Sequence, residues 1–245
     1  MAEFGTHIAS AFDRDLEGIQ ANIMKMGGLV EEAITKAAKS LETRDEELAA
    51  EVREGDKVID ALEEQLNEEA ARVIALRAPA ATDLRVVLSV MRMSANLERI
   101  GDLSKNMAKR TGVLVQMQAI GGTSTSLRRM AREVELMLAD ALDSYIQRDE
   151  ALAMDVIERD RDVDQMYNTL FREFLTFMLE DPRNITACMH LHFIAKNIER
   201  MGDHVTSIAE QVVFLTSGRK PDDARDKQDR TSVDPKLSVT ISDKD

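Results

Sequence analysis

Eight acidic residues form four pairs whose members are four positions apart: Asp56/Asp60, Glu98/Asp102, Asp160/Asp164 and Glu199/Asp203. Residues four apart share one face of a helix, so each pair would present two carboxylates side by side. Two neighbouring carboxylates can bind a metal cation between them. Taken singly, such a pair is typical of a solvated helix face, and a chain with 45 acidic residues contains several of them by chance.

Two of these pairs lie in a stretch that occurs twice. Residues 96–102 (Asn-Leu-Glu-Arg-Ile-Gly-Asp) and 197–203 (Asn-Ile-Glu-Arg-Met-Gly-Asp) are identical at five of seven positions. Like charges at this spacing repel, and a glycine inside a helix costs about 1 kcal/mol relative to alanine. Each copy therefore carries two unfavourable features at matching places. A cation held by the carboxylates, with the backbone close by, would account for both.

The other two pairs repeat as well, which indicates a duplicated chain. Residues 41–49 align with 145–153 at an offset of 104, and at the same offset Asp56 and Asp60 fall on Asp160 and Asp164. Glu98 matches Glu199 at an offset of 101, so three residues are lost near the turn before it. The sequence predicts two tandem repeats, 10–118 and 123–217, followed by a flexible charged tail, 219–245.

Each repeat reads as three amphipathic helices. Apolar residues recur every three or four positions over 12–41, over 45–76 and over 84–117, as expected for helices that pack in a bundle. Residues 1–10 carry no assignment, the Gly27-Gly28 pair allows a bend, and 121–126 (Gly-Gly-Thr-Ser-Thr-Ser) reads as a linker. The predicted fold class is all-α, with two sequence-related three-helix bundles in a six-helix architecture.

The helical reading places the four acids of each repeat on one surface. The second and third helices of a bundle are antiparallel neighbours, so their two pairs would converge at a half-shielded bundle edge. Oxygen ligands suit hard cations such as Mg²⁺, Ca²⁺, Mn²⁺ or ferric iron, with zinc less favoured. We therefore predict eight metal ligands: Asp56, Asp60, Glu98, Asp102, Asp160, Asp164, Glu199 and Asp203.

Composition narrows the function further. The net charge of −13 is a poor match for nucleic-acid phosphates or anionic lipids, so no nucleic acid is expected as a partner. The single cysteine, Cys188, and the lack of a long apolar run favour a reduced, cytoplasmic location. The chain also has no Gly-x-Ser-x-Gly elbow, no phosphate-binding glycine loop and no Glu-x-x-His pair of a di-iron oxidase. No catalytic residue is predicted.

Residues 7–217 resemble the PhoU family of bacterial phosphate-uptake regulators. The resemblance rests on His7, on 25–32 (Lys-Met-Gly-Gly-Leu-Val-Glu-Glu), on 81–85 (Ala-Thr-Asp-Leu-Arg) and on the two Asn-x-Glu-Arg-x-Gly-Asp segments. It implies two similar three-helix bundles without enzymatic activity. It also implies multinuclear metal clusters on the four acidic pairs, with Mg, Mn, Fe or Zn as candidate ions.

The same resemblance implies a negative regulator of the phosphate-starvation response. Its expected partners are the ATPase subunit of a phosphate ABC transporter, a phosphate-sensing histidine kinase and a second copy in a homodimer, with membrane contact only through these partners. Two alternatives stay open: a metal-storage or redox helical bundle, and a purely structural helical scaffold. An iron-oxidation assay distinguishes the metal-storage or redox bundle from the regulator. The absence of any bound metal would favour the structural scaffold.

Overall fold

The computed structural model describes residues 2–79 and 82–219, with side chains from Arg14 onward. These residues form six long helices and one short one. The helices are α1 (Ala2–Thr43), α2 (Glu46–Arg77), α3 (Thr82–Leu114), α4 (Thr123–Gln147), α5 (Glu150–Glu180), the 3₁₀ helix η1 (Pro182–Asn184) and α6 (Ile185–Ser217). The predicted all-α fold is confirmed. The predicted tail, 219–245, lies outside the described residues except for Arg219.

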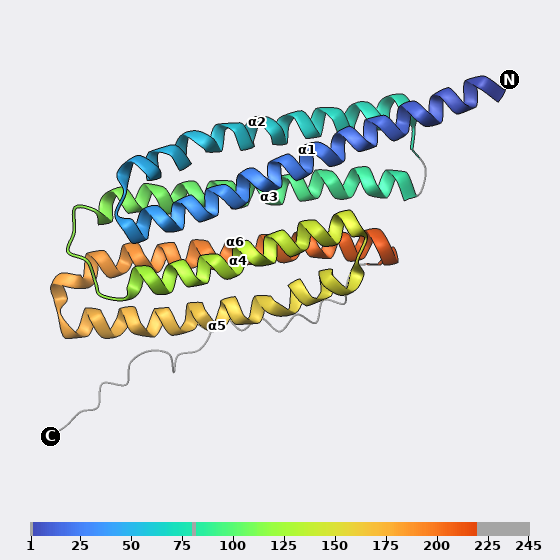
Figure 1. The fold of residues 1–245 in the computed structure, drawn as a ribbon. Helices are drawn as coiled ribbons and strands as arrows, with labels where there is room; N and C mark the ends of the chain where they lie inside the picture. Colours follow the sequence, from blue (N-terminus) through green and yellow to red (C-terminus); the bar gives the residue numbers. More distant parts are fainter. Residues whose placement is uncertain (1, 80–81, 220–245) are drawn as a thin grey trace.

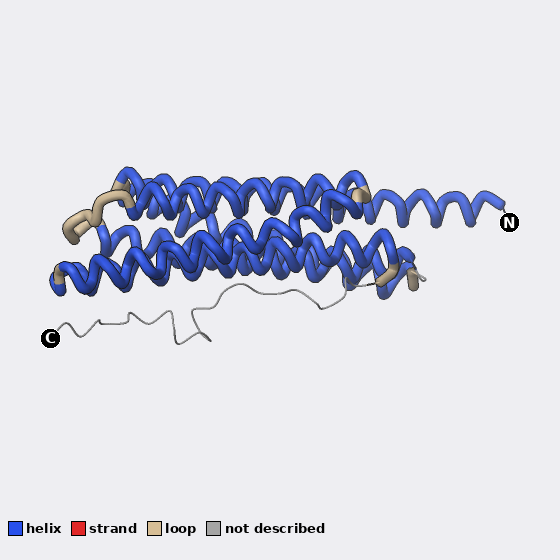
Figure 2. Tube along the Cα trace, turned by 90° about the horizontal axis from the view of Figure 1, so that it is seen from below, coloured by secondary structure: helices blue, strands red, loops and turns tan. Residues whose placement is uncertain are grey.

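The six helices run along one long axis and form two three-helix bundles, α1–α3 and α4–α6 (Figure 1). The bundles lie side by side, so that α1 packs on α4 and α3 packs on α6. Equivalent helices of the two repeats therefore meet in antiparallel pairs, with α2 and α5 on the outside (Figure 1). The view in Figure 2 shows the resulting elongated shape, with the beginning of α1 extending past the bundle.

The same short sequence, Arg-Asp-Glu, begins the second helix of each repeat. Asp45 accepts a hydrogen bond from the backbone N–H of Leu48, at 2.9 Å, and Asp149 accepts one from Leu152, at 3.0 Å. Each aspartate thus satisfies a backbone donor that the helix itself leaves unpaired. The preceding residues, Arg44 and Arg148, both adopt a left-handed backbone. The duplication therefore extends to the details of the turns.

The helices differ from the sequence expectations at three places. Residues 2–10, which carried no assignment, belong to α1. The predicted third helix, 84–117, is Thr82–Leu114, and most of the predicted linker at 121–126 is the first turn of α4. Gly122, just before this turn, has a φ of 83°, a left-handed backbone that suits a glycine. Polar Ser and Thr residues therefore open a helix here.

The first residue of the glycine pair in α1, Gly27, serves packing and not bending. Gly27 lies inside a continuous helix, and a Cβ atom built on it would collide with the Cδ1 atom of Leu142 in α4. Glycine at this position lets the two bundles approach closely.

Leu76 was expected in the apolar seam but is 71% exposed. The buried stripe of α2 ends with Leu66, Ala70 and Val73, and Leu76 lies beyond it in the last turn of the helix. Among the described helices, none combines the length and the hydropathy that a membrane span requires.

Candidate functional site: two carboxylate clusters

The structure brings the four acids of the first repeat together. Asp56 and Asp60 come from α2, and Glu98 and Asp102 come from the antiparallel helix α3. The glycine of the repeated segment permits this approach, because a Cβ atom on Gly101 would lie 3.1 Å from Ile59 Cδ1 and 3.6 Å from Asp56 Oδ1. The glycine therefore holds α2 and its aspartates close to α3. We call these four acids the first cluster.

Asp56 is the most buried member of the first cluster, at 4% exposure, and not half-shielded as the sequence suggested. Its Oδ2 atom accepts a hydrogen bond from Lys105 Nζ, and Lys105 also donates to Asp102 Oδ1 at 2.9 Å. Among the described residues, no donor lies within hydrogen-bonding distance of Asp56 Oδ1. An unpaired buried carboxylate oxygen is unfavourable, and a cation beside it would remove the penalty.

Electrostatic coupling confirms that the members of the first cluster are neighbours. Burial raises the pKa of Glu98, and the charges of Asp102 and Asp60 raise it further against the opposing effect of Arg99. Burial is the largest single influence on Asp102 and acts to raise its pKa, but the hydrogen bond and charge of Lys105, together with Glu98 and Arg99, outweigh it, so the pKa is lowered. The hydrogen bonds to Asp56 and Asp102 raise the pKa of Lys105. Lys105 is therefore a fully charged counter-ion.

Sequence reasoning missed Lys105. The available signal was its position three residues after Asp102, on the same face of the helix. At the offset of 101 the second repeat has Thr206, whose hydroxyl donates to the carbonyl of Gly202, at 2.9 Å. The counter-ion of the first cluster therefore has no equivalent at this position of the second repeat.

The second cluster consists of Asp160 and Asp164 on α5 and Glu199 and Asp203 on α6. Asp160, Asp164 and Glu199 are buried, and Asp203 is half-buried. A Cβ atom on Gly202 would lie 3.0 Å from Asp160 Oδ1, so this glycine again allows a carboxylate to rest on the helix backbone. The counter-ion here is Lys196, which donates to Glu199 Oε1 at 2.9 Å.

Other charged side chains near the clusters have structural partners. Arg99 lies 3.4 Å from Glu98 and 3.7 Å from Asp102, as expected for an ion-pair partner of nearby acids. Arg159, which replaces Gly55 in the second repeat, reaches away from the second cluster to Glu133 of α4, at 3.0 Å. Arg159 thus ties α4 to α5.

His204 joins the two repeated segments. Its Nδ1–H donates to Asn96 Oδ1 across the contact between α6 and α3, at 2.9 Å. Burial lowers the pKa of His204, so the ring is neutral at pH 7. The histidine is half-buried and lies outside the predicted ligand set. The two repeated segments therefore meet at the α3–α6 contact.

As the side chains stand, no three His, Cys, Asp or Glu residues among those described are arranged to hold one metal ion. In the first cluster an ammonium group already occupies the position between Asp56 and Asp102. Other features suit a cation: buried carboxylates, an unsatisfied oxygen on Asp56 and glycines that let an aspartate approach the helix backbone closely. The eight predicted ligands stay a prediction.

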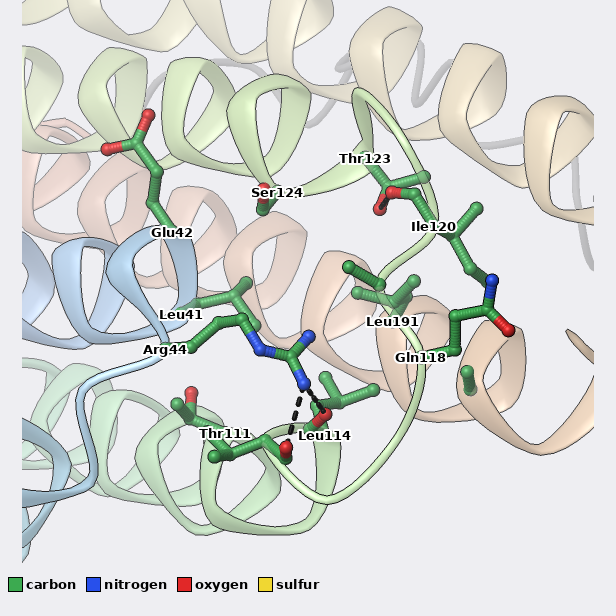
Figure 3. Close-up of a pocket in the computed structure, with 13 residues that line it drawn as sticks. Leu41, Glu42, Arg44, Thr111, Leu114, Gln118, Ile120, Thr123, Ser124 and Leu191 are labelled. Atoms are coloured by element: carbon green, nitrogen blue, oxygen red, sulfur yellow. Dashed lines mark hydrogen bonds between the residues drawn. The ribbon is translucent and has the colours of Figure 1, made fainter.

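A cavity of about 100 Å³ lies at one end of the molecule, between the two bundles and apart from the clusters (Figure 3). Apolar side chains including Leu41, Leu114 and Leu191 line it. Arg44 enters the cavity and donates to the carbonyls at the end of α3, including that of Leu114 at 3.0 Å (Figure 3). This arginine therefore joins the turn before α2 to the end of α3.

The fold and the clusters define a class of protein: a duplicated three-helix bundle in which each repeat carries paired carboxylates on its second and third helices. The family model described as the PhoU domain matches the chain twice, at residues 23–111 and 127–212. The chain belongs to this family.

Relatives match this chain over nearly its full length and theirs. A phosphate-specific transport system accessory protein PhoU homolog of Rhizobium meliloti is 42% identical, covering 93% of this chain and 96% of the relative. A homolog of the same name from Zymomonas mobilis is 47% identical, covering 90% and 93%.

Two crystal structures have the same fold. The structure of PhoU from Pseudomonas aeruginosa is 36% identical with a TM-score of 0.83, covering 85% of this chain and all of the other. The phosphate transport system regulatory protein PhoU from Streptococcus pneumoniae is 28% identical with a TM-score of 0.78, covering 86% and 99%.

Proposed function

We propose that this chain is a negative regulator of phosphate uptake and of the phosphate-starvation response. It acts as a non-enzymatic adaptor between the ATPase subunit of a phosphate ABC transporter and a phosphate-sensing histidine kinase. The observation that carries the proposal is the near-complete coverage of relatives named as accessory proteins of the phosphate-specific transport system. The elongated double bundle supports it, since a long helical surface offers separate faces to two partners (Figure 2).

The regulatory role is tested by deleting the gene and following a phosphate-starvation reporter in phosphate-rich medium. The proposal predicts that reporter expression rises on deletion and returns to the basal level when the intact gene is restored. An unchanged reporter in the deletion strain would contradict the regulatory role. Pull-down with the transporter ATPase and with the kinase tests the adaptor role, and capture of neither would contradict it.

We further propose that the two clusters bind metal ions of the Mg, Mn, Fe or Zn type through the eight predicted carboxylates. Bound metal would supply positive charge to two groups of buried acids. The buried Asp56 oxygen without a donor and the glycines at positions 101 and 202 support this assignment. Metal binding to the first cluster requires the ammonium group of Lys105 to move away from Asp56 and Asp102.

The metal proposal is tested by alanine at all eight acids. It predicts that co-purifying metal is lost while the circular-dichroism signal of the helices is largely retained, because the apolar core is unchanged. Unchanged metal content in this variant would contradict the assignment.

A further inference from the structure

One end of the α3–α6 contact exposes apolar side chains next to a cation. On α6, Ile185, Met189 and Phe193 follow one another at every fourth position and are 47%, 40% and 43% exposed. On α3, Val113 is 40% exposed. It lies one turn after Arg110, which contacts α6. We call these five residues the seam patch.

The antiparallel packing of α3 and α6 makes the seam patch continuous. Arg110 contacts both His190 and Phe193 on α6. Because the two helices are antiparallel, going along α3 from Arg110 to Val113 leads in the same direction as going back along α6 from Phe193 to Met189. Val113 and Met189 are therefore displaced to the same side of the Arg110–Phe193 contact. Exposed apolar groups gathered in this way mark interaction sites.

The charge around the seam patch is opposite to that of the chain. Residues 103–132 and 182–198 contain no Asp or Glu, although the whole chain has 45 of them and a net charge of −13. Arg128 and Arg183, which lie in these segments, pair with acids from neighbouring segments. Within the part of the chain that the structure describes, Lys109 and Arg110 form no ion pair with a carboxylate. The seam patch is thus an apolar surface with uncompensated positive charge.

Arg110 is held in position for an acidic ligand. The guanidinium carbon lies 4.3 Å from the centroid of the Phe193 ring, and Nη1 donates to His190 Nδ1 at 3.3 Å. Stacking on an aromatic ring fixes the plane of a guanidinium group and leaves its other N–H groups available for a carboxylate. Fixing the donor in advance lowers the entropy cost of binding.

We propose that the seam patch docks an amphipathic helix of a partner protein, whose apolar side chains cover Val113, Met189 and Phe193 and whose carboxylates reach Arg110 and Lys109. Ile185 to Phe193 spans about 12 Å along α6, the length of roughly two turns of a bound helix. Two uncompensated cations are few for an anionic membrane, which the net charge of the chain would repel.

The docking site would be one of the surfaces through which the proposed adaptor binds a partner. It rests on the proposed function only in requiring that a partner protein exists. The seam patch shares no residue with the carboxylate clusters.

The opposite end of the same helix pair provides a matched control. At the offset of 101, Arg92 takes the place of Phe193 and Gln211 takes the place of Arg110, and these two side chains lie 3.5 Å apart. Arg92→Glu therefore makes the same change of charge as Arg110→Glu in the same helix pair. It does so outside the seam patch.

The test uses the purified full chain and two fluorescent synthetic peptides of about 16 residues, which carry leucines on one helical face. One peptide has glutamates on its other face, and the second has lysines in their place. Fluorescence anisotropy is expected to show binding of the glutamate peptide and much weaker binding of the lysine peptide. Arg110→Glu should weaken binding of the glutamate peptide by about tenfold or more, whereas Arg92→Glu should change it by less than about twofold.

Circular dichroism checks that each variant is folded. If Arg110→Glu does not fold, Phe193→Ser replaces it in the binding test. Equal binding of the two peptides, no binding of either, or equal losses in Arg110→Glu and Arg92→Glu would each overturn the proposal. Binding to phosphatidylglycerol vesicles without binding to the glutamate peptide would assign the seam patch to lipid. Failure to bind either peptide, together with a shift to smaller species of Arg110→Glu in sedimentation, would assign it to a second copy. The deletion phenotype is measured separately, so failure of the adaptor function and failure of the docking site are distinguishable.

Discussion

The two repeats place the same four carboxylates on the same two helices but surround them differently. In the first cluster Asp60 is exposed, Glu98 and Asp102 are half-buried, and Lys105 neutralises Asp56. In the second cluster three of the four acids are buried, and Lys196 contacts Glu199. The counter-ion thus comes from the turn after the repeated segment in one copy and from the residue just before it in the other.

This difference shows what the duplication has retained and what it has not. Both glycines allow a carboxylate and its helix to approach the backbone closely, so the approach of the two helices is common to both repeats. The neutralising cation differs, because a lysine can reach the same carboxylates from either side along the helix. The second cluster is the more desolvated of the two, and we expect it to be the tighter metal site.

The largest effect is expected from removing one cluster at a time. Alanine at Asp160, Asp164, Glu199 and Asp203 should abolish the metal bound by the second repeat and leave that of the first, because each cluster uses acids of its own repeat. The reciprocal variant replaces Asp56, Asp60, Glu98 and Asp102. Metal content by mass spectrometry after dialysis measures both, and alanine at the exposed Glu47, Glu64, Glu68 and Glu158 controls for net charge. Metal that survives in full in either cluster variant would show that the repeats do not bind independently.

Replacing Lys105 should destabilise the protein through the first cluster, because the second cluster has no lysine at the equivalent position. In metal-free buffer Lys105→Met leaves the buried Asp56 without its cation, and we expect a loss of about 1–3 kcal/mol in the free energy of unfolding by urea. The exposed Lys109→Met, one turn further along α3, should change stability by less than about 0.5 kcal/mol. Mn²⁺ should restore the stability of Lys105→Met, because the metal replaces the ammonium group. Equal stability of the two lysine variants would contradict the role of Lys105.

The effect of Lys105 should also depend on pH. The lysine lowers the pKa of Asp102 below its ordinary value of 3.8, so the stabilisation is present at neutral pH and is lost as the pH falls through that lowered pKa. The difference between wild type and Lys105→Met should therefore shrink below about pH 4. A constant difference from pH 7 to pH 3 would contradict this linkage.

A smaller effect is expected where the two repeated segments meet. Asn96→Leu removes the hydrogen bond to His204 and should cost about 1 kcal/mol. The equivalent change in the second repeat, Asn197→Leu, faces a position where the first repeat has Leu103, and should cost less. Urea unfolding of the two variants measures the difference. An equal cost would mean that the hydrogen bond contributes nothing specific.

The smallest effect concerns the α1–α4 contact, where the equivalent residues Glu31 and Glu135 are neighbours. Burial, followed by the charges of Glu135 and Asp143, raises the pKa of Glu31. A raised carboxylate pKa means that the charged form disfavours the fold, so stability is lost as the pH rises through that pKa. Glu31→Gln should therefore stabilise the protein by a few tenths of a kcal/mol at pH 7, a value that allows for solvent screening. Thermal unfolding should show no gain at pH 3, nor for the exposed control Glu17→Gln.

Much of the fold could be predicted from the sequence because the local signals for helix starts agreed with the duplication of the whole chain. Asp45 and Asp149 mark helix starts by their side-chain chemistry, and the shared Arg-Asp-Glu turn revealed the duplication. The role of Gly27 could not be predicted, since it depends on a leucine of the other bundle. The exposure of Leu76 could not be predicted for a similar reason, because an apolar pattern does not show how far along a helix the neighbouring helices cover it.

The candidate site was predicted in outline only. Spacing and repetition identified which carboxylates share a helix face, and the structure brings those of the first repeat together across α2 and α3. Burial of Asp56 and the intervention of Lys105 depend on how closely two helices approach, which no single helical pattern contains. The seam patch also required the structure, because its residues come from two helices more than 70 positions apart in the sequence.

The most direct test is a crystal of the full chain grown with Mn²⁺ and measured for anomalous scattering. We predict peaks beside Asp56 and Asp102 in one repeat and beside Asp160 and Glu199 in the other, with Lys105 turned away from the first. Crystals with ordered carboxylates, Lys105 still on Asp56 and no peak at either cluster would contradict it.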